Sequence, residues 1–279
     1  MQKLKNFRFY ITNFPLIYSI IVLLFIFILN NVSVLFLCTL ESNILENKNF
    51  IAFIMILSKN INTIITVFVF NGLKYYKRGN FYKTFIPGFL YILIVLMALF
   101  GSFADAFCSN QEFKTIFEIF LGILYAFTIG FFEESILRGL ISNSFARKHA
   151  HNFTGVIKSI VYTNLIFGSL HMINIIQGVK LQSAILQSVA AFFIGCFLTI
   201  IYFRGGNLFV LIFIHTIIDM SGLFNFLFLN EDVTAVNIIN QYNTLQCLTP
   251  IPFYLIYSCF LLRKSKIKEI IYTIKNINK

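Results

Sequence analysis

Long apolar stretches, separated by short polar or basic segments, constrain this fold more than any other feature of the sequence. An α-helix needs about 20 apolar residues to cross the hydrocarbon of a bilayer. The sequence predicts eight such spans, over residues 14–40, 50–73, 87–104, 118–142, 157–176, 184–203, 208–229 and 249–263.

The composition supports a membrane environment. Hydrophobic residues make up 58% of the chain and charged residues 12%, which is more apolar surface than a water-soluble fold could cover. We therefore predict an all-α, polytopic membrane helix bundle with the lipid bilayer as its solvent. No linker or internal repeat divides the sequence, so we expect a single membrane domain over residues 1–279.

The basic residues indicate how the spans are oriented. Lys and Arg are enriched in the cytoplasmic loops of membrane proteins. If both termini are cytoplasmic, only Lys48, Lys114 and Lys180 among the basic residues of the loops and tails fall outside. We therefore predict a multi-pass protein of the cell membrane with cytoplasmic N- and C-termini. The net charge of +11 is then a topology signal and not a nucleic-acid-binding surface, because the basic residues form short clusters between apolar runs.

The C-terminal tail, residues 263–279, alternates basic and apolar side chains. Such a segment can lie along the anionic inner leaflet. It can equally be a solvated anchor after the last span, and the sequence leaves both interpretations open.

Ionisable side chains inside the predicted spans are the most informative feature for function. Each costs roughly 2.5–3.5 kcal/mol on insertion scales, so such residues are functional candidates. Lys59, in the second span, receives no role, since it can snorkel, line a cavity or mark a misplaced helix end. The other six lie in the fourth, fifth and seventh spans: Glu133, Glu134, Arg138, His171, His215 and Asp219.

The spacing of these residues predicts pairs on shared helix faces. Glu134 and Arg138 are four residues apart and can form an ion pair, which would leave Glu133 freer to act. His215 and Asp219 are also four apart, and a carboxylate beside an imidazole can orient it and raise its basicity. The structural alternatives are a Glu–Arg pair that only makes insertion tolerable and a lone histidine, His171, that only packs.

Depth in the bilayer predicts that the candidates meet. At 1.5 Å per residue, Glu133 and His171 lie roughly 20 Å, and His215 roughly 16 Å, from the basic residues taken as their cytoplasmic boundaries. One polar cavity near mid-bilayer could therefore contain all three. There a carboxylate and an imidazole that share a water can activate it, and a second imidazole can stabilise the oxyanion formed at a peptide carbonyl.

A metal-dependent route to the same reaction stays open. His171, His215 and Glu133 could hold a zinc ion with an open coordination position. The sequence has no HExxH motif, which excludes the common zinc-protease helix. Both routes lead to peptide hydrolysis, and no other cofactor is expected.

Three motifs in the sequence resemble those of the CAAX-protease and bacteriocin-processing family of intramembrane peptidases, also called the CPBP or Abi family. The resemblance covers residues 118–229, which we interpret as the catalytic core. The motifs are Glu133-Glu134-x-x-x-Arg138, Phe167-x-x-x-His171 and His215-x-x-x-Asp219.

This resemblance implies an eight-helix bundle with an active site inside the membrane that opens toward the cytoplasm. It implies Glu133 as the base that activates water, with His171 helping to hold that water. Glu134 and Arg138 would support the site. His215 would form the oxyanion hole with the residue four positions later, where eukaryotic CAAX-processing members usually carry Asn and this chain carries Asp219. An ionised Asp would repel an oxyanion unless it serves to orient His215.

The leading hypothesis is an intramembrane endopeptidase that cleaves a membrane-associated peptide or protein, such as a leader peptide or a lipidated tail. One alternative is a non-catalytic membrane protein of the same fold that confers immunity to a bacteriocin or acts as a scaffold. Another is an ion-coupled transporter with the buried carboxylates and histidines as a relay. Transporters often show inverted repeats and broken helices, and neither is visible in this sequence.

Overall fold

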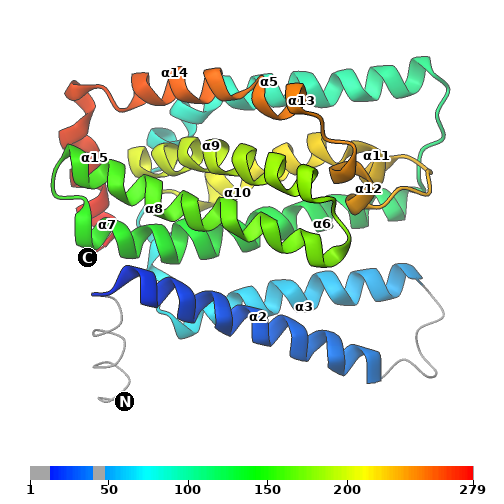
Figure 1. Cartoon of the computed structure of the whole chain (residues 1–279), viewed down its shortest axis with the longest axis horizontal. Helices are drawn as coiled ribbons and strands as arrows, with labels where there is room; N and C mark the ends of the chain where they lie inside the picture. The colour runs from blue at the N-terminus through cyan, green and yellow to red at the C-terminus, as the bar shows by residue number, and fades with distance from the viewer. Residues whose placement is uncertain (1–12, 40–47, 279) are drawn as a thin grey trace.

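The computed structural model describes residues 13–39 and 48–278. Most helices run along one common direction and form a bundle (Figure 1). The described residues contain no β-strand, only an isolated bridge between Phe113 and Leu229. The longer helices are α2 (Pro15–Thr39), α3 (Lys48–Val69), α5 (Phe81–Cys108), α6 (Ile116–Glu133), α8 (Phe153–His171), α9 (Leu181–Gly205), α10 (Leu208–Gly222), α14 (Ile251–Leu261) and α15 (Lys264–Ile277).

Shorter helices connect these elements. Two of them are not α-helical: η1 (Glu134–Ser142) is a π-helix that continues α6, and η2 (Met172–Gln177) is a 3₁₀-helix that continues α8. The others are α4 (Lys74–Lys77), α7 (Asn143–His149), α11 (Phe224–Phe228), α12 (Ala235–Asn240) and α13 (Thr244–Leu248).

The prediction of an all-α polytopic membrane bundle is confirmed. In the described part of the chain, seven helical segments are long and apolar enough to cross a bilayer. They are Pro15–Thr39, Lys48–Val69, Phe81–Cys108, Ile116–His149, Phe153–Gln177, Leu181–Gly205 and Thr244–Leu261.

The seventh predicted span, 208–229, is not one continuous helix. Its apolar helix, α10, has 15 residues and ends at Gly222, and after Leu223 the chain starts the separate helix α11. Ser221 and Gly222 have lower helix propensity than the residues around them. A run of apolar residues does not reveal such a break.

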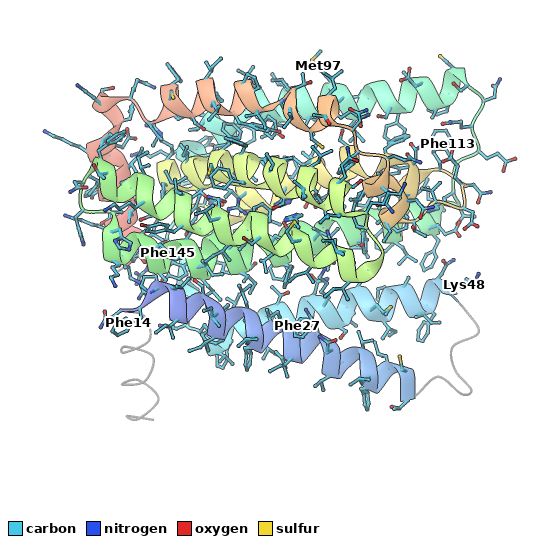
Figure 2. The ribbon with its side chains drawn as sticks, viewed as in Figure 1. Phe14, Phe27, Lys48, Met97, Phe113 and Phe145 are labelled. Carbon is cyan, nitrogen blue, oxygen red and sulfur yellow. The ribbon has the colours of Figure 1, made fainter. Side chains whose placement is uncertain are left out.

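The outer surface is apolar, as a lipid-facing surface must be. Phe27 of α2 and Met97 of α5 lie on opposite sides of the bundle (Figure 2), with 58% and 74% of their surface exposed. Phe68 of α3 is 65% exposed. In water these side chains would be destabilising, whereas in a bilayer they face acyl chains.

The helices around η1 form the interior of the bundle. Helix α10 packs against α6, α5 and η1, and α9 packs against α8, α5 and α14. The hairpin of α2 and α3 lies on one side and reaches the interior through contacts of α3 with α6 and η1 (Figure 1). A Cβ at Gly130 would lie 3.1 Å from the Ile212 carbonyl oxygen and from the Thr216 nitrogen. Glycine at this position therefore lets the backbones of α6 and α10 approach closely.

Helix α15 lies across one end of the bundle (red in Figure 1). Its buried face consists of Ile270, Ile274 and Ile277. On another face, the Glu269 carboxylate lies 3.9 Å from Arg204 and 3.8 Å from Lys83. The tail is thus a helix docked on the protein, which neither of the two sequence-based interpretations included.

Other basic side chains gather at the same end. Arg78 donates a hydrogen bond to the carbonyl oxygen of Ile277 (3.3 Å), and the charge of Lys74 interacts with those of Arg78 and Arg147. We call this the basic end of the bundle. The N-terminal basic residues that also entered the orientation argument lie outside the described residues.

Candidate active site

The π-helix η1 is the element that carries two of the six predicted site residues, Glu134 and Arg138. All nine of its residues are buried. Segments with i→i+5 hydrogen bonding are rare in proteins, and many of those that exist lie at functional sites. The side-chain amide of Asn143 donates to the carbonyl oxygens of Arg138 (2.9 Å) and Gly139 (3.1 Å). This side chain therefore satisfies backbone acceptors that the wider turn exposes.

Glu134 and Arg138 form an ion pair in the interior, with both side chains fully buried. Arg138 Nη1 lies 2.9 Å from Glu134 Oε1. Arg138 Nη2 donates to the carbonyl oxygen of Gly195 on α9 (3.1 Å), and the guanidinium lies 5.0 Å from the centre of the Phe167 ring on α8. Groups from η1, α8 and α9 thus surround the guanidinium of Arg138. Removing one partner of a buried ion pair leaves the other charge uncompensated, which is strongly destabilising.

Gly195 makes this arrangement sterically feasible. A Cβ on it would collide with the Asn164 side-chain oxygen and lie 2.7 Å from the Phe167 ring. Glycine therefore lets α9 bring its carbonyl group to Arg138 while Asn164 and Phe167 keep their places on α8. Neither Gly195 nor Asn143 was among the residues predicted from the sequence. The only available signal was a small or amide side chain within an apolar span, which many membrane helices share.

His215 of α10 lies between three carboxylates. Its Nδ1 is 2.6 Å from Glu134 Oε1, and its Nε2 is 3.4 Å from Glu133 Oε2 and 3.9 Å from Asp219 Oδ1. An imidazole can donate from both nitrogens only in its protonated form. Because Glu134 makes the shortest of the three contacts, it is the carboxylate that orients the ring. The sequence had predicted Asp219 for this task.

Glu133 and Glu134 are neighbours in sequence but differ in environment. Glu134 is fully buried and shared by Arg138 and His215, while the side chain of Glu133 is 19% exposed. Among the described residues, His215 is the group that pairs with Glu133. One carboxylate is thus fixed by its partners, and the other is accessible.

Asp219 makes the longest of the three carboxylate contacts with His215, through its Oδ1. Its Oδ2 is buried and, like Glu134 Oε2, has no hydrogen-bond partner among the described residues. A buried carboxylate oxygen without a partner is destabilising, so this group requires an explanation.

His171 joins the cluster only indirectly. It lies at the end of α8, where its Nδ1 is 3.0 Å from the carbonyl oxygen of Phe167 and its ring packs edge-on against the Phe167 ring at 4.8 Å. Phe167 in turn covers Arg138. The structure therefore brings five of the six predicted residues into direct contact and links the sixth through Phe167.

The side chains do not form a zinc site. In the described ranges, no group of three His, Cys, Asp or Glu residues is arranged to hold a metal ion. Glu133 lies 3.4 Å from His215 Nε2, whereas His171 is linked to these residues only through Phe167. As arranged, the three side chains therefore do not fit the proposed ligand set of His171, His215 and Glu133, and no step below passes through a metal.

Residues 115–221 match the family model described as "Type II CAAX prenyl endopeptidase Rce1-like". All six predicted site residues lie in this segment, which covers less than half of the chain. The match confirms the resemblance to the CAAX-protease family, and this likeness to a protease family supports a peptidase activity in general terms. Helices α2, α3 and α5 lie outside the matched segment. No curated protein and no solved structure matches the chain.

Proposed function

Because the segment that contains the cluster resembles CAAX endopeptidases, we propose that this protein is an intramembrane endopeptidase. It hydrolyses a peptide bond in a membrane-associated peptide or protein. The observation that carries the proposal is the accessible Glu133 carboxylate 3.4 Å from His215 Nε2, beside a second carboxylate, Glu134, that is buried and held through its Oε1 by both Arg138 and His215. The two neighbouring acids can therefore do different work.

Glu133 is the general base in this proposal. It takes a proton from a water molecule as the water oxygen bonds to the peptide carbonyl carbon. When the carbon–nitrogen bond breaks, Glu133 returns that proton to the departing amine, so the carboxylate is regenerated. A positioned acid–base group of this kind contributes about 10²–10⁴-fold to the rate.

His215 stabilises the oxyanion in this proposal. Glu134 holds the imidazole through Nδ1 at 2.6 Å, which fixes the ring and directs Nε2 toward Glu133. A donor placed where negative charge develops is worth about 10²–10³ in kcat. Arg138 acts through Glu134, because it balances the charge of that carboxylate and holds it in place.

The role of His171 follows from the resemblance and not from a contact. To help hold the water, it would use Nε2, which has no polar partner among the described residues, while the contact with Phe167 fixes Nδ1. We further propose that the basic end of the bundle faces the cytoplasm, since Lys and Arg accumulate there in membrane proteins. Both termini would then be cytoplasmic, and residues 1–279 would form one membrane domain of a multi-pass cell-membrane protein.

The decisive test is Glu133→Gln, measured with labelled membrane-tethered peptides and protein purified in detergent. The peptides should include a farnesylated CAAX tail and a leader peptide. We expect cleavage to fall at least about 10²-fold while the unfolding temperature changes little, because Gln preserves the shape of the side chain. Glu231→Gln, at an exposed acid in the loop after α11, is the matched control and should cleave normally.

Three results would contradict this assignment. Full activity in Glu133→Gln would remove Glu133 from the chemistry. Cleavage that is lost on chelation and restored by zinc would require the side chains to rearrange into ligands and would favour the metal-dependent route. A cellular phenotype that survives Glu133→Gln would instead favour a non-catalytic immunity or scaffold protein.

A further inference from the structure

Lys59 of α3 is a half-buried cation that none of the three sequence motifs includes. Its Nζ lies 5.0 Å from the centre of the Phe132 ring, next to Glu133 in the chain. The neighbouring Asn60 donates a hydrogen bond to Thr128 Oγ1 (2.7 Å), which fixes the register of α3 against α6. Lys59 therefore lies on the side of α3 that packs against α6.

Snorkelling does not account for this lysine. Lysines snorkel where they lie near the ends of membrane helices. Lys59 lies near the middle of α3 (Lys48–Val69), roughly 15 Å from either end at 1.5 Å per residue. It lines a cavity of about 570 Å³ between α2, α3 and α6, whose wall is mostly apolar. A charged group in such a place needs a partner.

The candidate site lacks one positive charge. It contains three carboxylates: Glu133, Glu134 and Asp219. Arg138 and His215 are the cations within contact distance, and both share the same oxygen of Glu134. Asp219 has a buried oxygen with no partner among the described residues, as Glu134 has, and Lys59 lies near enough to Asp219 and Glu133 for their charges to interact.

We propose that Lys59 is the counter-charge of Asp219 and Glu133, supplied to the active site by a helix outside the matched segment. With this cation in place, a third carboxylate can lie beside His215 without repelling the negative charge that develops on the substrate carbonyl. Lys59 is thus a positioning residue, which acts on the reaction through the carboxylates. Its catalytic consequence rests on the proposed peptidase function, but its pairing with Asp219 does not.

A double-mutant cycle tests the pairing without any assay of activity. The variants are Lys59→Met, Asp219→Asn and the two combined, with unfolding temperatures measured in detergent. Lys59→Met leaves Asp219 without its counter-charge and should lower the unfolding temperature by roughly 2–4 °C. Asp219→Asn should remove most of that loss, so the double variant should be more stable than the sum of the single effects predicts. Lys48→Met, at an exposed lysine where α3 begins, should have no effect.

The same variants test the catalytic consequence. Lys59→Met should reduce kcat/KM about tenfold, mainly through kcat, and Lys59→Arg should retain most activity because it keeps the charge. Asp219→Asn in the Lys59→Met background should restore part of the lost rate. Strictly additive effects on stability, or a Lys59→Met variant as stable as the wild type, would overturn the proposal. If stability couples but no peptide is cleaved even by the wild type, the pairing stands and the proposed peptidase function fails.

Discussion

The helices from α6 to α10 and the hairpin of α2 and α3 use polar residues in different ways. In the α6–α10 region, Glu134, Arg138 and Asn143 are completely buried and contact side chains or carbonyl groups from several helices. In the hairpin, only 11% of the most apolar stretch of α2 is buried. The polar side chains that join α2 to α3 form a small group, in which Asn62 donates to Asn30 and Ser33.

This difference shows where the chain can keep charges inside a membrane. A buried ion pair requires partners on all sides, and only a region enclosed by several helices provides them. The hairpin has lipid on one side, and Lys59, the one charge in the described α2 and α3 away from their ends, lies against Phe132 of α6. The family match covers the region from α6 to α10 and none of the hairpin, in keeping with this division.

The largest effect is expected from breaking the buried ion pair. Arg138→Met leaves Glu134 without its arginine in an interior site, which should destabilise the protein by about 3–5 kcal/mol. We expect poor yield of monodisperse protein in detergent and a large drop in unfolding temperature. Phe68→Ala, at a lipid-facing position of α3, should have a much smaller effect.

A second variant separates charge from volume. Replacing both partners, as in Arg138→Met with Glu134→Leu, should recover part of the lost stability, because no unpaired charge remains. If Arg138→Met alone were as stable as the wild type, the contrast between the enclosed region and the hairpin would be wrong.

A smaller effect is expected from adding a side chain at Gly195, where α8 and α9 pack closely. The new methyl group of Gly195→Ala would meet Phe167 at 2.7 Å, so α8 and α9 must separate, at about 1–3 kcal/mol. The Gly195 carbonyl would also move away from Arg138, and peptide cleavage should fall with stability. Thermal unfolding in detergent and initial cleavage rates measure both.

Gly101→Ala is the matched control on α5. A Cβ at that position meets no atom within 4 Å, and alanine favours helix over glycine by about 0.8–1.0 kcal/mol. The same substitution should therefore destabilise one helix and leave the other unchanged or slightly more stable. Equal losses at both positions would show that close packing around Arg138 is not what requires Gly195.

Much of this architecture could be predicted from the sequence. Apolar runs of membrane length identified the helices, because the bilayer imposes both their length and their composition. The spacing of Glu134 and Arg138 predicted a pair, since residues four apart are neighbours on a helix, and the structure contains that pair. The catalytic roles and the orientation stay predictions until the experiments above are done.

Other features depend on contacts between helices and could not be predicted. All nine residues of η1 are buried, so no alternation of apolar and polar side chains distinguishes this π-helix from an α-helix in the sequence. His215 could be assigned to a carboxylate only within its own helix, and Asp219 was the nearest; the structure instead gives Glu134, 81 positions away in the chain. Which helices meet depends on small residues such as Gly130 and Gly195, whose effect is visible only when both helices are placed.

The smallest effect is expected at the basic end, where polar contacts are partly exposed to water. A hydrogen bond from the Lys266 ammonium (3.0 Å) lowers the pKa of Glu269, and Arg204 and Lys83 contribute in the same direction. The Glu269 side chain is 29% exposed, so the stabilisation should be that of a surface ion pair, about 0.2–1 kcal/mol. Because the pKa is lower in the folded state, this contribution is present at neutral pH and is lost as the pH falls through the folded pKa.

Glu269→Gln should therefore unfold at a slightly lower temperature than the wild type at pH 7, and the difference should shrink toward acid pH, as measured by thermal unfolding in detergent at both pH values. If the difference in unfolding temperature persisted in acid, packing of α15 and not the charge of Glu269 would be its cause. If the loss of stability were as large as that of Arg138→Met, exposure to water would not weaken polar contacts in this protein.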